Sequence, residues 1–94
     1  MYCKGVRDDG AIIISDMLKS NESLEELLLG KNRIGNNGAF MISCSLKENK
    51  FLKELALPFN DIGLEGVVHI IDALKSNSSL KIMSLGSNNL GITR

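Results

Sequence analysis

The sequence predicts an α/β solenoid, a right-handed superhelix with parallel strands on its concave side and helices on its convex side. Two observations support this fold class. The segments LEELLLGKNRIG, LKELALPFNDIG and LKIMSLGSNNLG begin at Leu24, Leu52 and Leu80, so one pattern returns every 28 residues. Within each unit, apolar residues first alternate with a period of two and then recur at helical spacing. Because one such unit cannot bury its apolar face alone, several units must stack to form a core.

The first half of each unit reads L-x-x-L-x-L-x-x-N-x-[IL], which indicates a short strand followed by a turn. The two leucines of L-x-L point to one side of the strand, and the residue between them points to the other side. We expect strands near Glu25–Leu29, Lys53–Leu57 and Lys81–Leu85.

An asparagine follows each expected strand, at Asn32, Asn60 and Asn88. Its amide both donates and accepts hydrogen bonds, so it can satisfy backbone groups of neighbouring turns. We therefore predict a structural ladder of amides here, and no catalytic role. Asn21 and Asn77 begin N-x-[ST] glycosylation patterns. Both fall in the return loop of the repeat, so we interpret them as structural too.

The second half of each unit has helical periodicity. In the middle unit, Ala39, Ile42, Ser43 and Leu46 share one helical face. The equivalent residues of the other units are Ala11, Ile14, Ser15 and Leu18, and Val67, Ile70, Ile71 and Leu74. We expect helices near Asp9–Lys19, Asn37–Lys47 and Glu65–Lys75.

Charged and polar residues mark the ends of the expected helices. Asp8 and Asn36 are expected to cap the starts of the first two helices, which they immediately precede. Lys19, Lys47 and Lys75 lie near the helix ends, where a positive charge suits the helix dipole.

Composition excludes several classes of function. The 94 residues fit one small domain, and eleven basic residues balance eleven acidic ones. This balance argues against binding to nucleic acid or to a membrane surface through bulk charge. The N-terminus lacks a hydrophobic signal core, so we expect a cytoplasmic protein in which Cys3 and Cys44 are reduced thiols. With His69 as the only histidine, we expect neither a metal site nor a cofactor.

The quoted motifs resemble the leucine-rich repeat family. LEELLLGKNRIGNNGA, LKELALPFNDIGLEGV and the return segments LKSNESL and LKSNSSL are similar to the ribonuclease-inhibitor-like subtype. That subtype occurs in the repeat domains of NOD-like receptors and of Ran GTPase-activating proteins. The resemblance covers almost the whole chain and is specific for the fold, whereas the family is a scaffold with many partners.

We expect a single repeat domain over residues 1–94. It would consist of a partial repeat at 1–23, repeats at 24–51 and 52–79, and a partial repeat at 80–94, cut from a longer array. The repeat register places Met1 under Leu29 and Lys4 under Asn32, so the first unit is expected to lack its strand and its asparagine. Open solenoid ends present unpaired strand edges and apolar surface, which could also pair with another copy.

The resemblance implies that a partner is met by the concave strand surface and the loops after it. The candidate residues at these outward positions are Glu26, Leu28, Lys31, Arg33, Glu54, Ala56, Pro58, Phe59, Asp61, Ile82, Ser84, Ser87 and Asn89. Phe59, beside Pro58, could anchor a peptide or protein, or could merely cover the loop between units. Glu26 and Glu54 form an acidic pair that could receive a basic partner, or could simply be solvated.

The convex helix surface is a second candidate interface. Ile13 and Met41 are expected to be exposed there. Phe40 and Val68 are expected to fill gaps between adjacent helices, and His69 is expected to lie on the surface or to pack between helices.

The function predicted from these observations is a non-enzymatic protein-interaction scaffold. The pattern places no base near the helical serines Ser15, Ser43 and Ser45, and a phosphate-binding G-x-x-x-x-G-K-[ST] loop is absent from the sequence. Two alternatives remain: a GTPase-activating protein of the Ran type, and a module that self-assembles through its open solenoid ends. The Ran type would need a long array and an acidic tail, which this sequence does not contain.

Overall fold

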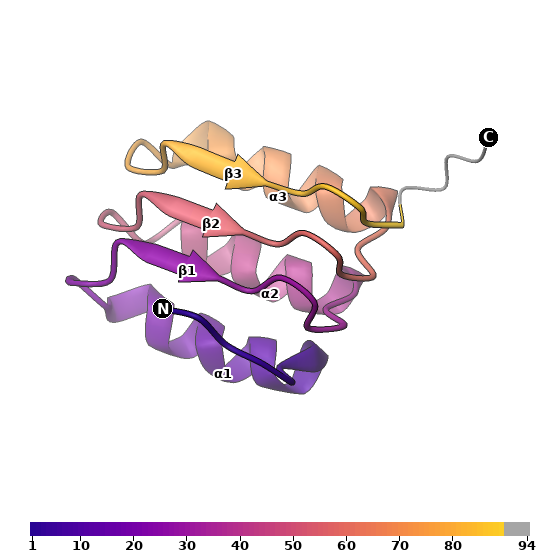
Figure 1. Cartoon of the computed structure of the whole chain (residues 1–94). Helices are drawn as coiled ribbons and strands as arrows, with labels where there is room; N and C mark the ends of the chain where they lie inside the picture. Colours follow the sequence, from indigo (N-terminus) through magenta and orange to yellow (C-terminus); the bar gives the residue numbers. More distant parts are fainter. Residues whose placement is uncertain (90–94) are drawn as a thin grey trace.

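The computed structural model describes residues 1–89, in which helices and strands alternate (Figure 1). The elements are α1 (Arg7–Ser20), β1 (Glu26–Leu28), α2 (Asn36–Leu46), β2 (Glu54–Ala56), α3 (Leu64–Ser76) and β3 (Ile82–Ser84). The three strands form one layer and the helices form a second layer behind it (Figure 1). The predicted solenoid of parallel strands and helices is confirmed, and each element lies where it was expected, with ends that differ by one or two residues.

The strands are parallel, in the order β1-β2-β3. Glu26 pairs with Glu54, and Glu54 pairs with Ile82, so the step of 28 residues is also the register of the sheet. The core lies between the two layers. Its fully buried residues include Leu27, Leu29, Leu55 and Leu57 from the strand segments and Ala11, Leu18, Ala39, Ile42, Leu46, Ile70 and Ala73 from the helices.

The asparagine ladder connects adjacent units at the end of the strands. The buried Asn60 accepts hydrogen bonds at Oδ1 from the amides of Asn32 and Ile34, at 2.9 and 3.0 Å. Its Nδ2 donates to the carbonyl of Leu29 at 2.8 Å and to that of Leu57 at 3.1 Å. The side-chain amide therefore satisfies buried backbone groups of two successive units that form no hydrogen bonds within the sheet or the helices.

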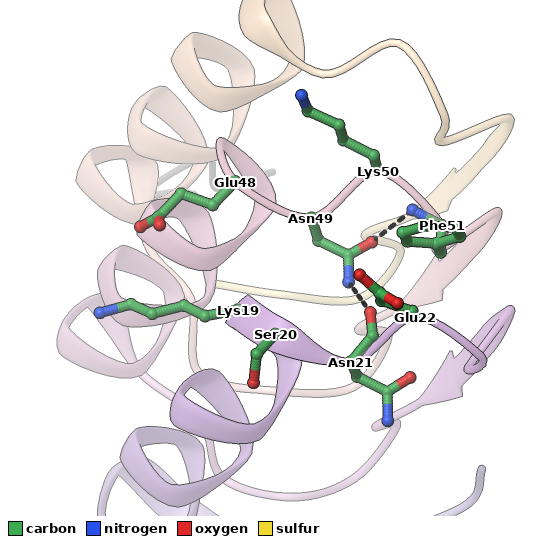
Figure 2. Close-up of a pocket in the computed structure, with 8 residues that line it drawn as sticks. All are labelled: Lys19, Ser20, Asn21, Glu22, Glu48, Asn49, Lys50 and Phe51. Carbon is green, nitrogen blue, oxygen red and sulfur yellow. Dashed lines mark hydrogen bonds between the residues drawn. The ribbon is translucent and has the colours of Figure 1, made fainter.

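A second ladder connects the return loops at the opposite end. Asn49 donates from Nδ2 to the carbonyls of Leu18 and Asn21, and accepts at Oδ1 from the amides of Phe51 and Leu52. Figure 2 shows Asn49 between Asn21 and Phe51. Asn77 repeats the same bonds one unit later, and the side chain of Asn21 accepts from two amides of its own loop.

The expected helix caps were assigned to the wrong helices. Asp8 and Asn36 lie inside the first turns of α1 and α2 and form no cap hydrogen bond to these helices. Instead, Asp8 Oδ1 accepts from the amides of Gly35 and Gly38, at the start of α2, at 2.7 and 3.2 Å. Asn36 Oδ1 accepts in the same way from Gly63 and Gly66, at the start of α3, at 2.7 and 3.0 Å. Each cap therefore serves the helix of the following unit.

As expected, the described residues contain no strand before α1, but the N-terminal residues still pair with β1. Tyr2 forms a parallel bridge with Leu28, and the amide of Leu28 donates to the carbonyl of Met1. The pairing is displaced by two residues from the repeat register. Asn32 Nδ2 donates to Cys3, 29 residues earlier, whereas Asn60 Nδ2 donates to Leu29, 31 residues earlier.

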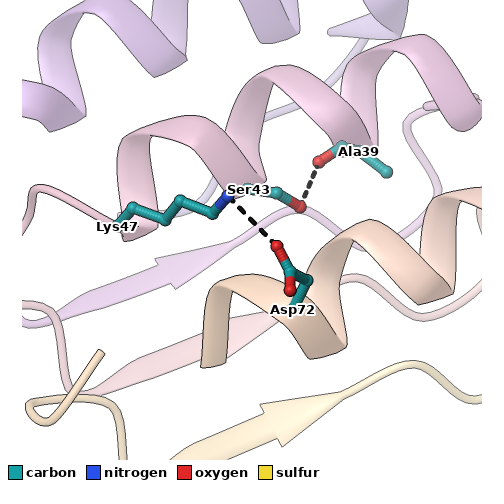
Figure 3. Close-up of polar contacts among 4 residues, drawn as sticks. All are labelled: Ala39, Ser43, Lys47 and Asp72. Carbon is teal, nitrogen blue, oxygen red and sulfur yellow. Dashed lines mark hydrogen bonds and ion pairs between the residues drawn. The ribbon is translucent and has the colours of Figure 1, made fainter. Parts of the chain in front are cut away.

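The helices pack in order, α1 on α2 and α2 on α3. Ser15 and Ser43 are buried between them, and Ser45 Oγ donates to the carbonyl of Ser15 at 2.7 Å. Ser43 Oγ donates to the carbonyl of Ala39, and Lys47 Nζ lies 3.1 Å from the Asp72 carboxylate on α3. Both contacts are drawn in Figure 3.

Several helix residues are more exposed than expected. Ile71 was assigned to the buried face and is 50% exposed, because among the described residues no further helix covers that side of α3. Val68 is 57% exposed and does not fill a gap. Phe40 is 44% exposed, but its ring packs edge-on against His69 of the adjacent helix α3, with centroids 4.8 Å apart. Ile13 is exposed as expected, whereas Met41 is half-buried.

Candidate functional site

The outward face of the sheet presents the side chains that alternate with the core leucines. Glu26, Glu54 and Ile82 occupy paired positions on neighbouring strands, and Ile82 is 52% exposed. The two glutamates therefore lie side by side, in contact with solvent, as the sequence predicted. The next outward row holds Leu28, Ala56 and Ser84, each half-buried.

Tyr2 extends this row and was missed as a candidate. It bridges to Leu28 and is 65% exposed, so an aromatic ring lies at the edge of the strand face. The repeat register alone already places Tyr2 under Gly30, an outward position, and this alignment could have identified it. We call the surface formed by Tyr2 and the outward residues of β1–β3, with the loops that follow the strands, the strand face.

Phe59 is the most exposed of the candidate apolar side chains on the strand face, at 57%. Lys31, Phe59 and Ser87 stand at the same position of three successive loops, and all three have left-handed backbone angles, with φ of 60°, 55° and 59°. A left-handed conformation is unfavourable for a bulky side chain such as phenylalanine. The loop thus holds the ring outward at some cost in backbone strain.

Two contacts organise the surroundings of Phe59. The Lys31 ammonium lies 5.6 Å from the centroid of its ring, within the range of a cation–π interaction. Pro58 packs against the backbone of Gly30, where an added Cβ would lie 3.2 Å from Pro58 Cγ. The arrangement combines an apolar ring with a nearby cation and, toward the start of the strands, an acidic pair.

The other candidate residues are not gathered around Phe59. Asp61, Ser87 and Asn89 are exposed in the loops after β2 and β3. Arg33 lines a separate open hollow with Arg7, Asp8 and Asp9. A further hollow lies at the return loops, and acidic, basic and uncharged residues line it (Figure 2). These residues are Lys19, Ser20, Asn21, Glu22, Glu48, Asn49, Lys50 and Phe51.

Among residues 1–89, no group of three or more histidine, cysteine, aspartate or glutamate side chains is placed to hold a metal ion. In the same residues, no helix has the length and hydropathy needed to cross a membrane. Cys3 and Cys44 are free thiols.

Comparison with known proteins identifies the family. The model of the leucine-rich repeat family matches residues 20–43 and 48–70, together half of the chain. The chain belongs to the leucine-rich repeat family. No curated protein matched the sequence.

A solved structure has the same fold. It is described as "Leiomodin-1 Actin-Binding Site 2 (ABS2)" and superposes with a TM-score of 0.82 at 26% sequence identity. The match covers 90% of this chain and 48% of the leiomodin chain, so this protein spans about half the length of that structure. Repeat-family membership and this neighbour indicate a protein-interaction module.

Proposed function

We propose that this leucine-rich repeat protein is a non-enzymatic recognition module that binds a protein partner through its strand face. The observation that carries the proposal is Phe59, an aromatic side chain more than half exposed on a backbone conformation that disfavours it. Lys31 and Ser87 share this backbone conformation at the same position of the repeat, so what distinguishes Phe59 is its exposed aromatic ring. Exposed aromatic residues are also common anchors of protein interfaces.

The chemistry of the strand face defines the partner it suits. Phe59 would enter an apolar pocket of the partner, and the adjacent Lys31 would meet an acidic or carbonyl group at the edge of that pocket. Glu26 and Glu54 would receive basic side chains, which steers association and fixes orientation more than it adds affinity. The ribonuclease-inhibitor-like subtype fits this use, because each 28-residue unit contains a full helix behind its strand. We propose a cytoplasmic location, where Cys3 and Cys44 stay reduced.

Actin is the first partner to test, because the similar leiomodin structure is described as an actin-binding site. The labelled chain would be titrated with purified actin monomers and, separately, with filaments. Phe59→Asn removes the ring, and asparagine tolerates the left-handed conformation, so folding is retained. We expect binding of the wild-type chain and a loss of about tenfold or more in Phe59→Asn, the range of an interface anchor.

The matched control is Ile13→Asp, which changes a 72% exposed residue on α1 in the helix layer. Unchanged affinity in this variant together with weakened Phe59→Asn would support the strand face. The reverse pattern would assign binding to the helices, and no binding of wild type would reject actin. Acceleration of GTP hydrolysis by a Ran-like GTPase would overturn the non-enzymatic assignment.

A further inference from the structure

One side of α3 carries an exposed apolar stripe. Leu64, Val68 and Ile71 are 64%, 57% and 50% exposed, and their spacing of four and three residues places them on one helical face. We call these three residues the α3 stripe. In the repeat register they correspond to Asn36, Phe40 and Ser43 of α2, and to Asp8, Ile12 and Ser15 of α1.

In α1 and α2, the residues at these positions face the helix of the following unit. Asp8 and Asn36 cap the helix of the next unit, and Phe40 packs against His69 of α3. Ser15 and Ser43 are only 2% exposed, so their small side chains allow the helices to approach closely.

The α3 stripe lacks both of these devices. Leu64 has no acceptor atom that could cap a following helix, and Ile71 is much bulkier than the serines at its register. An added helix in the geometry of the α1–α2 pair would leave its first amides uncapped and would clash with Ile71. The stripe is therefore not built to receive one more helix in that geometry.

We propose that the α3 stripe is a self-association surface, on which α3 of a second copy packs in the antiparallel direction. A two-fold axis near the level of His69 and Ile70 would place Val68 of one copy against Ile71 of the other. Such an interface is isologous, because the same patch serves both copies. Antiparallel packing also aligns the two helix dipoles favourably.

The charges beside the stripe are complementary under this symmetry. Glu65 lies in the first turn of α3, and Lys75 lies in its last turn, and both are exposed. In an antiparallel pair, each Lys75 lies near Glu65 of the other copy. A parallel pair would instead bring like charges together.

The apolar surface continues from α3 to the edge of the sheet. Leu74, Leu80, Ile82 and Met83, together with Asn77 and Lys81, line an open hollow at this end of the molecule, and Ile82 is 52% exposed. The second copy would thus cover apolar area beyond the stripe, which favours association in proportion to the area removed from water.

The test is the dissociation constant of the dimer, measured by sedimentation equilibrium of the 94-residue chain over a concentration series. Val68→Asp places a charge at the centre of the interface and should weaken the dimer by about tenfold or more. Lys75→Glu alone should weaken it several-fold, and Glu65→Lys combined with Lys75→Glu should restore it to near the wild-type value. Ile13→Asp, on the far helix α1, should leave it unchanged.

Each outcome bears on the proposal. A chain that stays monomeric at all concentrations would overturn it, as would a dimer that resists Val68→Asp or is abolished by Ile13→Asp. A double charge reversal that fails to recover the dimer would overturn the antiparallel arrangement. Circular dichroism of each variant distinguishes lost association from lost folding. Phe59→Asn should not alter the dimer, so this test is independent of the strand-face proposal.

Discussion

The middle unit and the third unit have equivalent residues in different environments. Leu46 is fully buried, whereas Leu74, 28 residues later, is half-buried. Asn60 is 6% exposed, whereas Asn88 at the same register is half-buried. The middle unit has neighbours on both sides, and the third unit has one among the described residues. Burial in this fold is thus decided by the stacking of units as much as by residue type.

The sharpest test of this comparison is the pair Leu46→Ala and Leu74→Ala. The two variants remove the same atoms at the same register. We expect Leu46→Ala to lower the free energy of unfolding by about 2–5 kcal/mol, and Leu74→Ala to lower it by about half as much, because less apolar area and a smaller cavity are involved. Urea unfolding followed by circular dichroism measures both. Equal losses would show that the two units are energetically equivalent.

The asparagine ladder gives the second test. Asn60 bonds to five backbone groups, namely those of Leu29, Asn32, Ile34, Leu57 and Pro58. Asn88 bonds to three within residues 1–89. Because buried groups left without a partner are costly, we expect Asn60→Ala to lose about 3 kcal/mol and Asn88→Ala about 1 kcal/mol. A larger loss in Asn88→Ala than in Asn60→Ala would contradict the ladder as the source of stability.

A glycine pair tests the connection between units. An added Cβ at Gly66 would lie 2.7 Å from both Asn36 Oδ1 and Ile62 Cγ2, whereas one at Gly86 would meet no atom of residues 1–89 within 4 Å. Gly66→Ala should displace the cap on α3 and lower stability by about 1–3 kcal/mol, the usual range for overpacking. Gly86→Ala should leave the midpoint of unfolding almost unchanged. The same urea titrations compare them, and a tolerated Gly66→Ala would mean that the cap can shift without loss.

The smallest expected effect compares α1 with α2. Ser15 Oγ is buried and has no hydrogen-bond partner among residues 1–89, whereas Ser43 Oγ donates to the carbonyl of Ala39 at 2.7 Å. Ser15→Ala removes an unsatisfied hydroxyl and should stabilise the protein by about 1 kcal/mol. Ser43→Ala should give no gain of this size, since it removes a formed bond. The midpoint of thermal unfolding of both variants measures these changes. A lower stability of Ser15→Ala would indicate that the hydroxyl of Ser15 is hydrogen-bonded in solution.

Much of the fold could be predicted because the repeat supplies the same information three times. The alternation around Leu27 and Leu29 defined both the strand and its outward residues, and the spacing of Asn32, Asn60 and Asn88 gave the register. The caps could not be placed correctly, because capping rules consider the helix that a residue precedes, and Asp8 serves a helix 27 residues away. The shift at Tyr2 was equally hidden, because the segment from Cys3 to Val6 is two residues shorter than its equivalent from Leu29 to Ile34, and the repeat pattern does not mark this difference.

The candidate site was predictable in outline only. The alternation of side chains along each strand correctly identified the outward positions of Glu26, Glu54 and Ile82. The left-handed backbone of Phe59 and its contact with Lys31 arise from loop geometry. The spacing of apolar residues in the sequence does not reveal this geometry. The role of these residues in binding stays a prediction. The fold requires only that outward residues tolerate solvent, and it does not determine which of them contact a partner.

The caps that cross from one unit to the next also determine which changes in chain length the protein can accept. Deleting residues 9–36 would remove one full period and bring Asp8 into the place of Asn36, with the same recipients, Gly63 and Gly66, at the same sequence separation. Loss or gain of a whole unit therefore preserves the caps and the asparagine ladders. An insertion of one residue between Asp8 and Gly35 would misplace the cap, the ladder and the strand register together. At the edge of the stack, Asn32 keeps its bonds to Cys3 and Val6 although the segment between them is two residues shorter than in the next unit.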